Sequence, residues 1–430
     1  MITKTLALKT NSSNTLIVAF DVGKSSLDFY FEIPNPITST FEASTGITPN
    51  KPEDIVATLS QLSAIATSNG FTNLLVTCES TGVYSEKLLR LARQQGHQTA
   101  YVSGESVHKL KVLENNDSGK TDTKDPRVIL MIAKMDKTLR HRPISGAYLA
   151  LRELNRAYDE EKQLMSSLKC KISSVLTRLF CDLDLYTQLI YKVTGKALYE
   201  LFRFNPYRIV EKGQVQFVKM MRKHQRGIHG ETLEKIWKSA CTSSLLILED
   251  GYIAAMEYRL EGIWDKMKVA ELRMNEIESK MELLYKELLH NGEKVPLVGV
   301  GFLSAFRIGR ILGETGPLND FPNIEALMKY AGLNLKERRS GKYIGKVHLS
   351  KKGRSSLRKV LGEISFGMVK KTSVYGDYYH YKKGKGMNGT KILVAVERKL
   401  LKTFYTLGMK CVAFDASRLG QCESQLKKAA

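Results

Sequence analysis

Short apolar runs alternate with amphipathic stretches through the first 140 residues, and this alternation restricts the possible folds more than any other feature. Apolar runs bounded by turn residues indicate strands, whereas apolar residues at three- and four-residue spacing indicate helices. Strands are expected at residues 15–23, 26–33, 73–79 and 97–102, and helices at 52–68 and 85–95. The first two strands are expected to form a hairpin. The sequence therefore predicts an α/β domain whose sheet contains parallel pairs.

Two long stretches without proline follow, at residues 147–192 and 245–289, and both repeat Leu, Ile and Met at helical spacing. They predict long helices. Residues 258–281 hold apolar side chains at roughly heptad intervals, which suits an antiparallel coiled coil or an oligomer interface; a helical spacer within one subunit fits equally well. We expect four parts: a polar leader (1–14), an α/β domain (15–142), a helical or coiled-coil region (143–290) and a mainly α-helical C-terminal domain (291–430).

The chain is strongly basic, with 66 Lys and Arg against 44 Asp and Glu and a formal net charge of +22. Such a charge repels itself unless a polyanion lies against the surface, so nucleic acid is the expected partner. No apolar run is long enough to cross a membrane, and no membrane partner is expected. The six cysteines form no CxxC pair and are expected to be reduced thiols. The expected location is the cytoplasm, in association with the nucleoid.

Four carboxylates stand where strands and a helix are expected to end or begin. Asp21 and Glu79 end two apolar strands, so both side chains are expected at one edge of the sheet. Asp122 and Asp125 are three residues apart, and Pro126 suits the first turn of the helix that follows. Taken singly, Asp21 also fits a turn residue and Asp122 a helix cap. Together the four suit Mg²⁺, with Mn²⁺ as a substitute, in phosphodiester transfer by two metal ions.

A second basic region lies near the C-terminus, where residues 336–359 contain ten basic residues and only Glu337 on the acidic side. A hairpin at residues 338–353 and a helix from about residue 355 are expected. Just upstream, two glycines resemble a helix-hairpin-helix turn that lets backbone N–H groups approach a phosphate, although a simple loop also fits. The expected nucleic-acid-binding residues are Gly299, Gly301, Arg338, Arg339, Lys342, Lys346, Lys351, Lys352, Arg354 and Arg358. A basic middle segment, residues 202–230, suits either nucleic acid or a solvated face.

Ser340 lies inside this basic region between Arg339 and Gly341. A serine hydroxyl becomes a good nucleophile only when neighbouring groups stabilise its charge, and the flanking Arg338, Arg339 and Lys342 have that capacity. A serine before a glycine is also an ordinary turn residue. The residues alone leave both interpretations open.

The order of Asp, Glu and a close Asp pair on strand, strand and helix resembles the RuvC-type branch of the RNase H-like nucleases. More narrowly, residues 19–25, 78–84 and 120–125 look like the DEDD motifs of the insertion sequence 110 family of transposases. Pro126 departs from that family, which has a small residue there. In the C-terminal part, residues 298–301, 330–333, 339–341 and 349–353 are similar to the transposase domain of the same family.

The resemblance implies a transposase that exchanges DNA strands at element ends and target. It implies metal ions on Asp21, Glu79, Asp122 and Asp125, and a catalytic serine at Ser340 that leaves a phosphoserine-linked strand. Ser350 and Ser355 compete for that role, because the family's proline after the Ala-Gly-Leu segment is absent here. A homo-oligomer, dimer or tetramer, and a structured noncoding bridge RNA as guide are implied as well.

Two other functions fit the same residues. One is a metal-dependent nuclease that resolves DNA junctions with an activated water, in which Ser340 only binds phosphate. The other is a noncatalytic nucleic-acid-binding scaffold whose carboxylates are structural.

Overall fold

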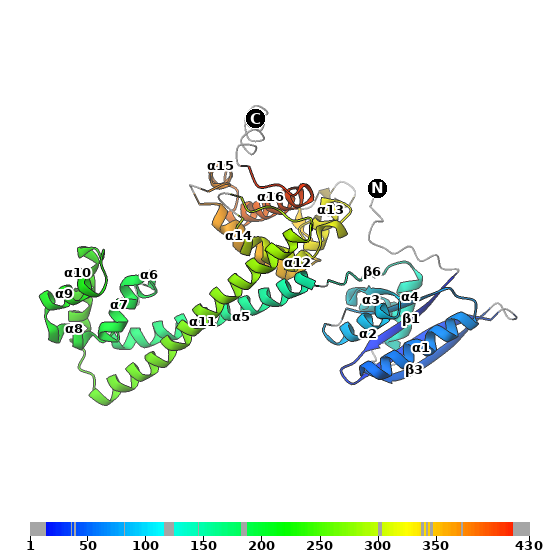
Figure 1. Cartoon of the computed structure of the whole chain (residues 1–430), viewed down its shortest axis with the longest axis horizontal. Coiled ribbons are helices and arrows are strands. Elements are labelled where there is room, and N and C mark those ends of the chain that lie inside the picture. The colour runs from blue at the N-terminus through cyan, green and yellow to red at the C-terminus, as the bar shows by residue number, and fades with distance from the viewer. Residues whose placement is uncertain are drawn as a thin grey trace, which may run out of the picture. The chain divides into compact units, whose positions relative to one another are not determined.

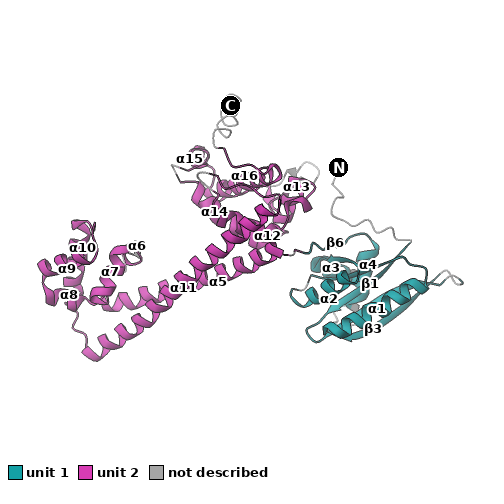
Figure 2. Cartoon of the chain, in the orientation of Figure 1, with its two compact units in different colours: residues 1–143 teal, residues 144–430 magenta. Residues whose placement is uncertain are grey.

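The computed structural model describes residues 14–35, 37, 40–80, 82–115, 124–144, 146–181, 187–299, 303–336, 339–340, 343–344, 347–370 and 373–415. The chain forms two compact units, residues 1–143 and 144–430 (Figure 2). The predicted four-part division of the chain stays a prediction. None of the described helices is both long and apolar enough to cross a membrane.

The first unit is an α/β domain around a mixed sheet with strand order β3-β2-β1-β4-β5-β6. Strand β2 (Ser26–Pro34) pairs antiparallel with both β1 (Thr15–Val22) and β3 (Phe41–Pro49). Strands β4 (Asn73–Glu79) and β5 (Gln98–Val102) continue the sheet in parallel with β1, and the short β6 (Leu139–Arg140) closes it antiparallel to β5. The predicted RNase H-like class, with a hairpin and parallel pairs, is confirmed.

Two helical layers cover the sheet, and strict alternation along the strands determines which side chain faces which layer. Leu16, Val18 and Phe20 of β1 pack with α1 (Pro52–Ser68) and α2 (Tyr84–Gln94). Ile17 and Ala19 pack on the other face, with α3 (Gly104–Asn115) and α4 (Lys124–Lys134). The next residue of that second set along β1 is Asp21.

The second unit is almost entirely helical, as predicted. Helices α5 (Gly146–Leu179) and α11 (Asp250–His290) pack along each other in opposite directions within the chain (Figure 1). Between them in sequence come α6 (Thr187–Ile190), α7 (Val193–Phe202), α8 (Pro206–Lys212), α9 (Gln214–His224) and α10 (Gly230–Ser243). A core that includes Trp264, Tyr199 and Phe204 joins these helices to the C-terminal half of α5 and the N-terminal half of α11.

The C-terminal part forms a second core with the N-terminal turns of α5 and the C-terminal turns of α11. Its helices are α12 (Ala305–Thr315), the 3₁₀ turn η2 (Leu318–Asp320), α13 (Ile324–Ala331), α14 (Ser355–Met368), α15 (Gly376–Gly384) and α16 (Gly389–Lys410). Two small antiparallel pairs lie between α13 and α14. They are β7 (Leu335–Lys336) with β10 (His348–Leu349), and β8 (Arg339–Ser340) with β9 (Tyr343–Ile344). The small hairpin expected here is therefore present.

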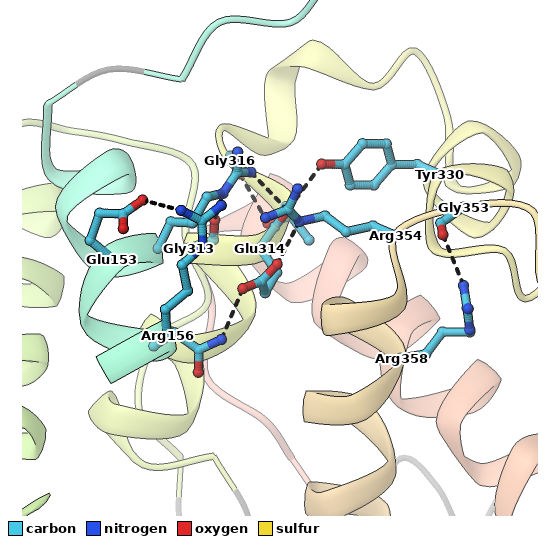
Figure 3. A network of polar contacts seen from close by, with 12 residues as sticks. Glu153, Arg156, Gly313, Glu314, Gly316, Tyr330, Gly353, Arg354 and Arg358 are labelled. Carbon is cyan, nitrogen blue, oxygen red and sulfur yellow. Dashed lines mark hydrogen bonds and ion pairs between the residues drawn. The ribbon is translucent and has the colours of Figure 1, made fainter. Parts of the chain in front are cut away.

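A buried ionic network ties α5 to α12 and α14. Arg310, whose side chain is 5% exposed, donates to Asp159 at 2.9 Å and to Glu363 at 2.8 Å. Glu314, 1% exposed, accepts from Asn155 at 2.8 Å and pairs with Arg354 (Figure 3). Charges buried this deeply are tolerated only when each has partners. The network therefore determines how the three helices pack.

Close packing of α12 on α5 depends on Gly313. A Cβ at this position would lie 2.8 Å from the carbonyl carbon of Leu151 and 2.9 Å from the backbone nitrogen of Arg152. We expect Gly313→Ala to lower the free energy of unfolding by about 1–3 kcal/mol, because backbone atoms must separate. Gly262 in α11 is the matched control, since nothing lies within 4 Å of its Cβ position. There the same change is expected to stabilise by about 0.5–1 kcal/mol. Chemical denaturation measures both, and equal signs would contradict the close approach.

Candidate active site

Asp21 and Glu79 lie next to each other at one edge of the first unit's sheet. Strands β1 and β4 are parallel with Phe20 beside Cys78, so the register places Asp21 beside Glu79. Both continue the alternation of the face that packs against α4, because Ile17 and Leu75 belong to that core cluster. The two carboxylates predicted to meet at a sheet edge therefore share both an edge and a face.

Helix α4 brings a third carboxylate to the same place. Asp125 lies in the first turn of this helix, which packs on β1 and β4. The positive end of the helix dipole favours negative charge at that turn. Asp122, the fourth predicted carboxylate, lies outside the described residues.

Asp21 is affected by the charges of its acidic neighbours. Burial raises the pKa of Asp21, and the negative charges of Asp125 and Asp28 raise it further. A carboxyl group with a raised pKa binds its proton more readily, unless a cation offsets the surrounding negative charge. A cation at this place would therefore favour the charged form of Asp21.

Asp28 is an acidic neighbour that the sequence interpretation missed. It is the antiparallel partner of Asp21 across the β1–β2 hairpin, and directly opposed residues project from the same face of a sheet. The sequence held one usable signal. The predicted hairpin between residues 15–23 and 26–33 has a short turn, and aligning its strands across that turn places these two aspartates opposite each other.

Lys111 of α3 supplies positive charge to the cluster. Its ammonium group forms an ion pair with Asp125, and its charge lowers the pKa of Asp21. Helix α3 also begins tightly against the site, since a Cβ on Gly104 would collide with the Glu79 carboxylate. Glycine at residue 104 therefore leaves room for that carboxylate.

The donor set fits a hard divalent cation. All candidate ligands are carboxylates, which Mg²⁺ and Mn²⁺ prefer, and their mutual repulsion falls when a dication binds. Within the described ranges, no three His, Cys, Asp or Glu residues lie close enough together to ligate one ion. The Asp125 carboxylate forms an ion pair with Lys111. Asp21, Glu79 and Asp125 are the predicted metal ligands that the structure describes, and their role as ligands stays a prediction.

Ser340, the predicted nucleophile, lies in the second unit. Its backbone forms strand β8 and pairs with Tyr343 of β9. Two other serines competed for its role. The Ser350 hydroxyl is engaged by Asn334 and by the amide of Lys352, at 3.3 Å from the latter, so it holds the turn together. Ser355 is exposed at the start of α14.

Two of the arginines predicted to bind nucleic acid make internal contacts. The Arg354 guanidinium group pairs with buried Glu314, and Arg358 donates to the carbonyl oxygens of Ala331 at 2.9 Å and Gly353 at 3.2 Å (Figure 3). Lys351 and Lys352 are exposed on the preceding turn. The side chain of Arg339 and the residues Arg338, Lys342 and Lys346 lie outside what the structure describes.

Gly299 packs against the far end of the chain. A Cβ there would lie 3.0 Å from the backbone nitrogen of Phe414. The glycine therefore allows a close approach within the protein, and its predicted contact with phosphate stays a prediction. Ser304 caps α12 by accepting from the amide of Arg307 at 3.3 Å. Gly301 and the centre of the predicted helix-hairpin-helix turn lie outside the described residues.

Two protein-family models identify the chain as a transposase. A DEDD transposase model of the IS110 type matches residues 18–181, and a model described as "Transposase IS116/IS110/IS902 family" matches residues 297–380. Together they cover more than half of the chain. A similar solved structure is T. thermophilus RuvC in complex with a Holliday junction substrate, with 10% identity and a TM-score of 0.20, covering 29% of this chain and 99% of that one. Comparison with curated proteins gives no match.

Proposed function

The chain belongs to the IS110 family of transposases, and from that premise we propose that it cleaves and exchanges DNA strands of a mobile insertion element with metal-binding carboxylates and a serine nucleophile. The observation that carries this proposal is that Asp21 and Glu79 share one edge and face of the sheet, and that Asp125 of α4 is close enough to raise the pKa of Asp21. A purely structural role would not require carboxylates to be gathered in a partly buried place where Asp21 and Asp125 repel each other.

In this proposal Asp21, Glu79, Asp122 and Asp125 hold divalent ions, Mg²⁺ by preference with Mn²⁺ as a substitute. Such ions supply Lewis-acid stabilisation of the charge that develops on the phosphodiester. The carboxylates fix where the scissile phosphate lies. Lys111 changes partner when the ions bind, because its present contact with Asp125 occupies a ligand oxygen.

Ser340 performs the covalent step. Its hydroxyl oxygen attacks phosphorus, a new Oγ–P bond forms, the P–O bond to the leaving strand breaks, and the serine proton is transferred so that the leaving strand ends in a hydroxyl. A hydroxyl from the strand to be joined then attacks the phosphoserine and restores Ser340. The engagement of the Ser350 hydroxyl in its own turn argues against Ser350 as the nucleophile of this segment.

The family supports three further parts of the proposal. The two sites lie in different units, so they meet through folding or from different subunits of a homo-oligomer, a dimer or tetramer. A structured noncoding bridge RNA guides the choice of target. The protein works in the cytoplasm, at the nucleoid.

Trapping of the covalent intermediate tests the proposal. Full-length protein is incubated with labelled element-end DNA and Mg²⁺ and then denatured, and a serine-linked DNA species is expected. Ser340→Ala is expected to lose this species and strand exchange by at least about 10³-fold. Ser355→Ala is the matched control in the same basic region and should retain both. If Ser340→Ala retains full strand exchange, Ser340 is not the nucleophile. If the original protein cleaves DNA without forming a serine-linked species, water is the nucleophile and the enzyme is a junction-resolving nuclease. If no metal-dependent cleavage occurs at all, the protein is a binding scaffold.

A further inference from the structure

Helix α15 and the turn after it carry an unusual mixture of tyrosines and lysines. Residues 375–391 contain four tyrosines, four lysines and a single acidic residue, Asp377. The proposed active sites do not use this segment. An ordinary solvated helix face mixes charges of both signs and carries few rings, so the composition needs another explanation.

One side of α15 anchors it to the protein. Tyr375, at 1% exposure, belongs to the core of the C-terminal part, and Tyr378 packs against that core from a half-buried position. The remaining tyrosines are not needed for this anchoring. Tyr381 is 44% exposed, and Tyr379 is half-buried.

The outward rings have lysine ammonium groups over their faces. We call the group the lysine–tyrosine cluster and define it as Tyr378, Tyr379, Tyr381, Lys382, Lys383, Lys385 and Lys399. Lys399 lies 3.9 Å from the centre of the Tyr378 ring, Lys385 lies 4.8 Å from that of Tyr381, and Lys383 lies 5.8 Å from that of Tyr379. Three of the tyrosines precede a lysine by four residues, which places ring and ammonium group on one helical face. Ring faces and positive charges are therefore presented together.

Unpaired nucleic acid fits this surface better than other polyanions do. A nucleobase stacks on an aromatic face more strongly than an exposed lysine does, so bases displace the ammonium groups and leave them free for phosphates. A DNA duplex offers no such base faces, because its bases are stacked on one another. An acidic peptide would engage the lysines and leave the rings without a matching partner.

We propose that the lysine–tyrosine cluster holds an unpaired DNA strand, with bases stacked on Tyr379 and Tyr381 and phosphates on Lys382, Lys383 and Lys385. DNA is the substrate of the transposase family to which the chain belongs, and strand cleavage frees single-stranded ends. The inference rests on the proposed function only for this choice of DNA. Binding at the cluster does not need Ser340 or the carboxylates.

Fluorescence anisotropy with labelled oligo-dT and full-length protein, without divalent metal, tests the proposal. Tyr379→Leu with Tyr381→Leu removes two stacking rings and is expected to weaken binding at least about 30-fold. Tyr381→Phe keeps the ring and is expected to bind like the original protein. Tyr258→Leu, at another exposed tyrosine, is the matched control with no expected effect. Lys383→Gln with Lys385→Gln should make the log–log salt dependence shallower by about 1.4.

Three results would overturn the proposal: unchanged oligo-dT affinity in the double tyrosine variant, an equal loss of duplex and single-strand binding, or an effect confined to oligo-U RNA. An effect confined to an acidic peptide would do the same. The Ser340→Ala variant separates this idea from the proposed function. Whether Ser340→Ala loses catalysis or keeps it, we expect oligo-dT binding by this variant to fall when Tyr379 and Tyr381 are replaced as well. A failure of the proposed function therefore leaves this test unchanged.

Discussion

Replacing Asp21 with asparagine is expected to reduce metal-dependent DNA cleavage and strand exchange by at least about 10³-fold while leaving the protein folded. Asn keeps the size of the side chain and removes the charge at the position where β1 and β4 end together. Burial and the neighbouring Asp125 and Asp28 raise the pKa of Asp21, so its charged form is disfavoured in the folded protein without metal. Loss of that charge should therefore leave the thermal stability of the metal-free protein equal or higher.

The two readouts together make the test specific. Cleavage is measured with labelled element-end DNA over a range of Mg²⁺ concentrations, and the midpoint of thermal unfolding is measured without metal. Asp54→Asn, in α1 on the opposite layer, is the matched control for activity and should leave cleavage unchanged. Cleavage within tenfold of the original protein at saturating Mg²⁺ would remove Asp21 from the active site. A large loss of stability would mean that the charge has a structural role.

Arg354→Met is expected to lower the free energy of unfolding of the second unit by about 3–5 kcal/mol. Glu314 is 1% exposed, and Arg354 is its ion-pair partner. Removing Arg354 leaves the buried Glu314 carboxylate with only the hydrogen bond from Asn155 and the charge of Arg152, and losing a partner of a buried charge destabilises far more than loss of an exposed pair does. Met keeps much of the volume of the arginine stem, so packing changes little.

A second substitution identifies the cause. Glu314→Gln in the Arg354→Met background removes the uncompensated charge and is expected to recover most of the lost stability in chemical denaturation. Lys352→Met, at an exposed lysine of the same basic segment, is the control and should change stability by less than about 0.5 kcal/mol. If Arg354→Met changes stability by less than about 1 kcal/mol and weakens DNA binding instead, Arg354 contacts DNA, as its place in the basic segment predicts.

Local sequence patterns predicted the elements with strong periodicity. The strand at residues 73–79 and the helix at residues 52–68 appear with the same bounds, because a buried strand and an amphipathic helix have distinct spacings. Strand β3 was missed because it is an edge strand rich in Thr, Ser, Glu and Gly, with little apolar alternation. The two-residue β6 is too short to carry a pattern.

The sequence predicted the part of the site that strand ends determine, but not the part that depends on helix packing. Asp21 and Glu79 were expected to meet because parallel strands end at one edge of a sheet. Lys111 could not be predicted, since its partner Asp125 is reached only through the packing of α3 on α4. The role of Arg354 was hidden for the same reason: Glu314 precedes it by 40 residues. A basic residue in a basic segment gives no local sign that its charge is used internally.

The two long helices of the second unit fix the spacing of two hydrophobic cores. The first turns of α5 and the last turns of α11 belong to one core, and their opposite ends belong to the other. Each residue of an α-helix adds about 1.5 Å of length and about 100° of rotation. A single inserted residue in both helices would therefore turn the distal core to another side. A seven-residue insertion in each helix would lengthen the α5–α11 pair, here called the stalk, by about 10 Å. It would nearly preserve the orientation of one core relative to the other. Among natural variants of such a protein, length changes in this stalk should come in matched pairs of two helical turns.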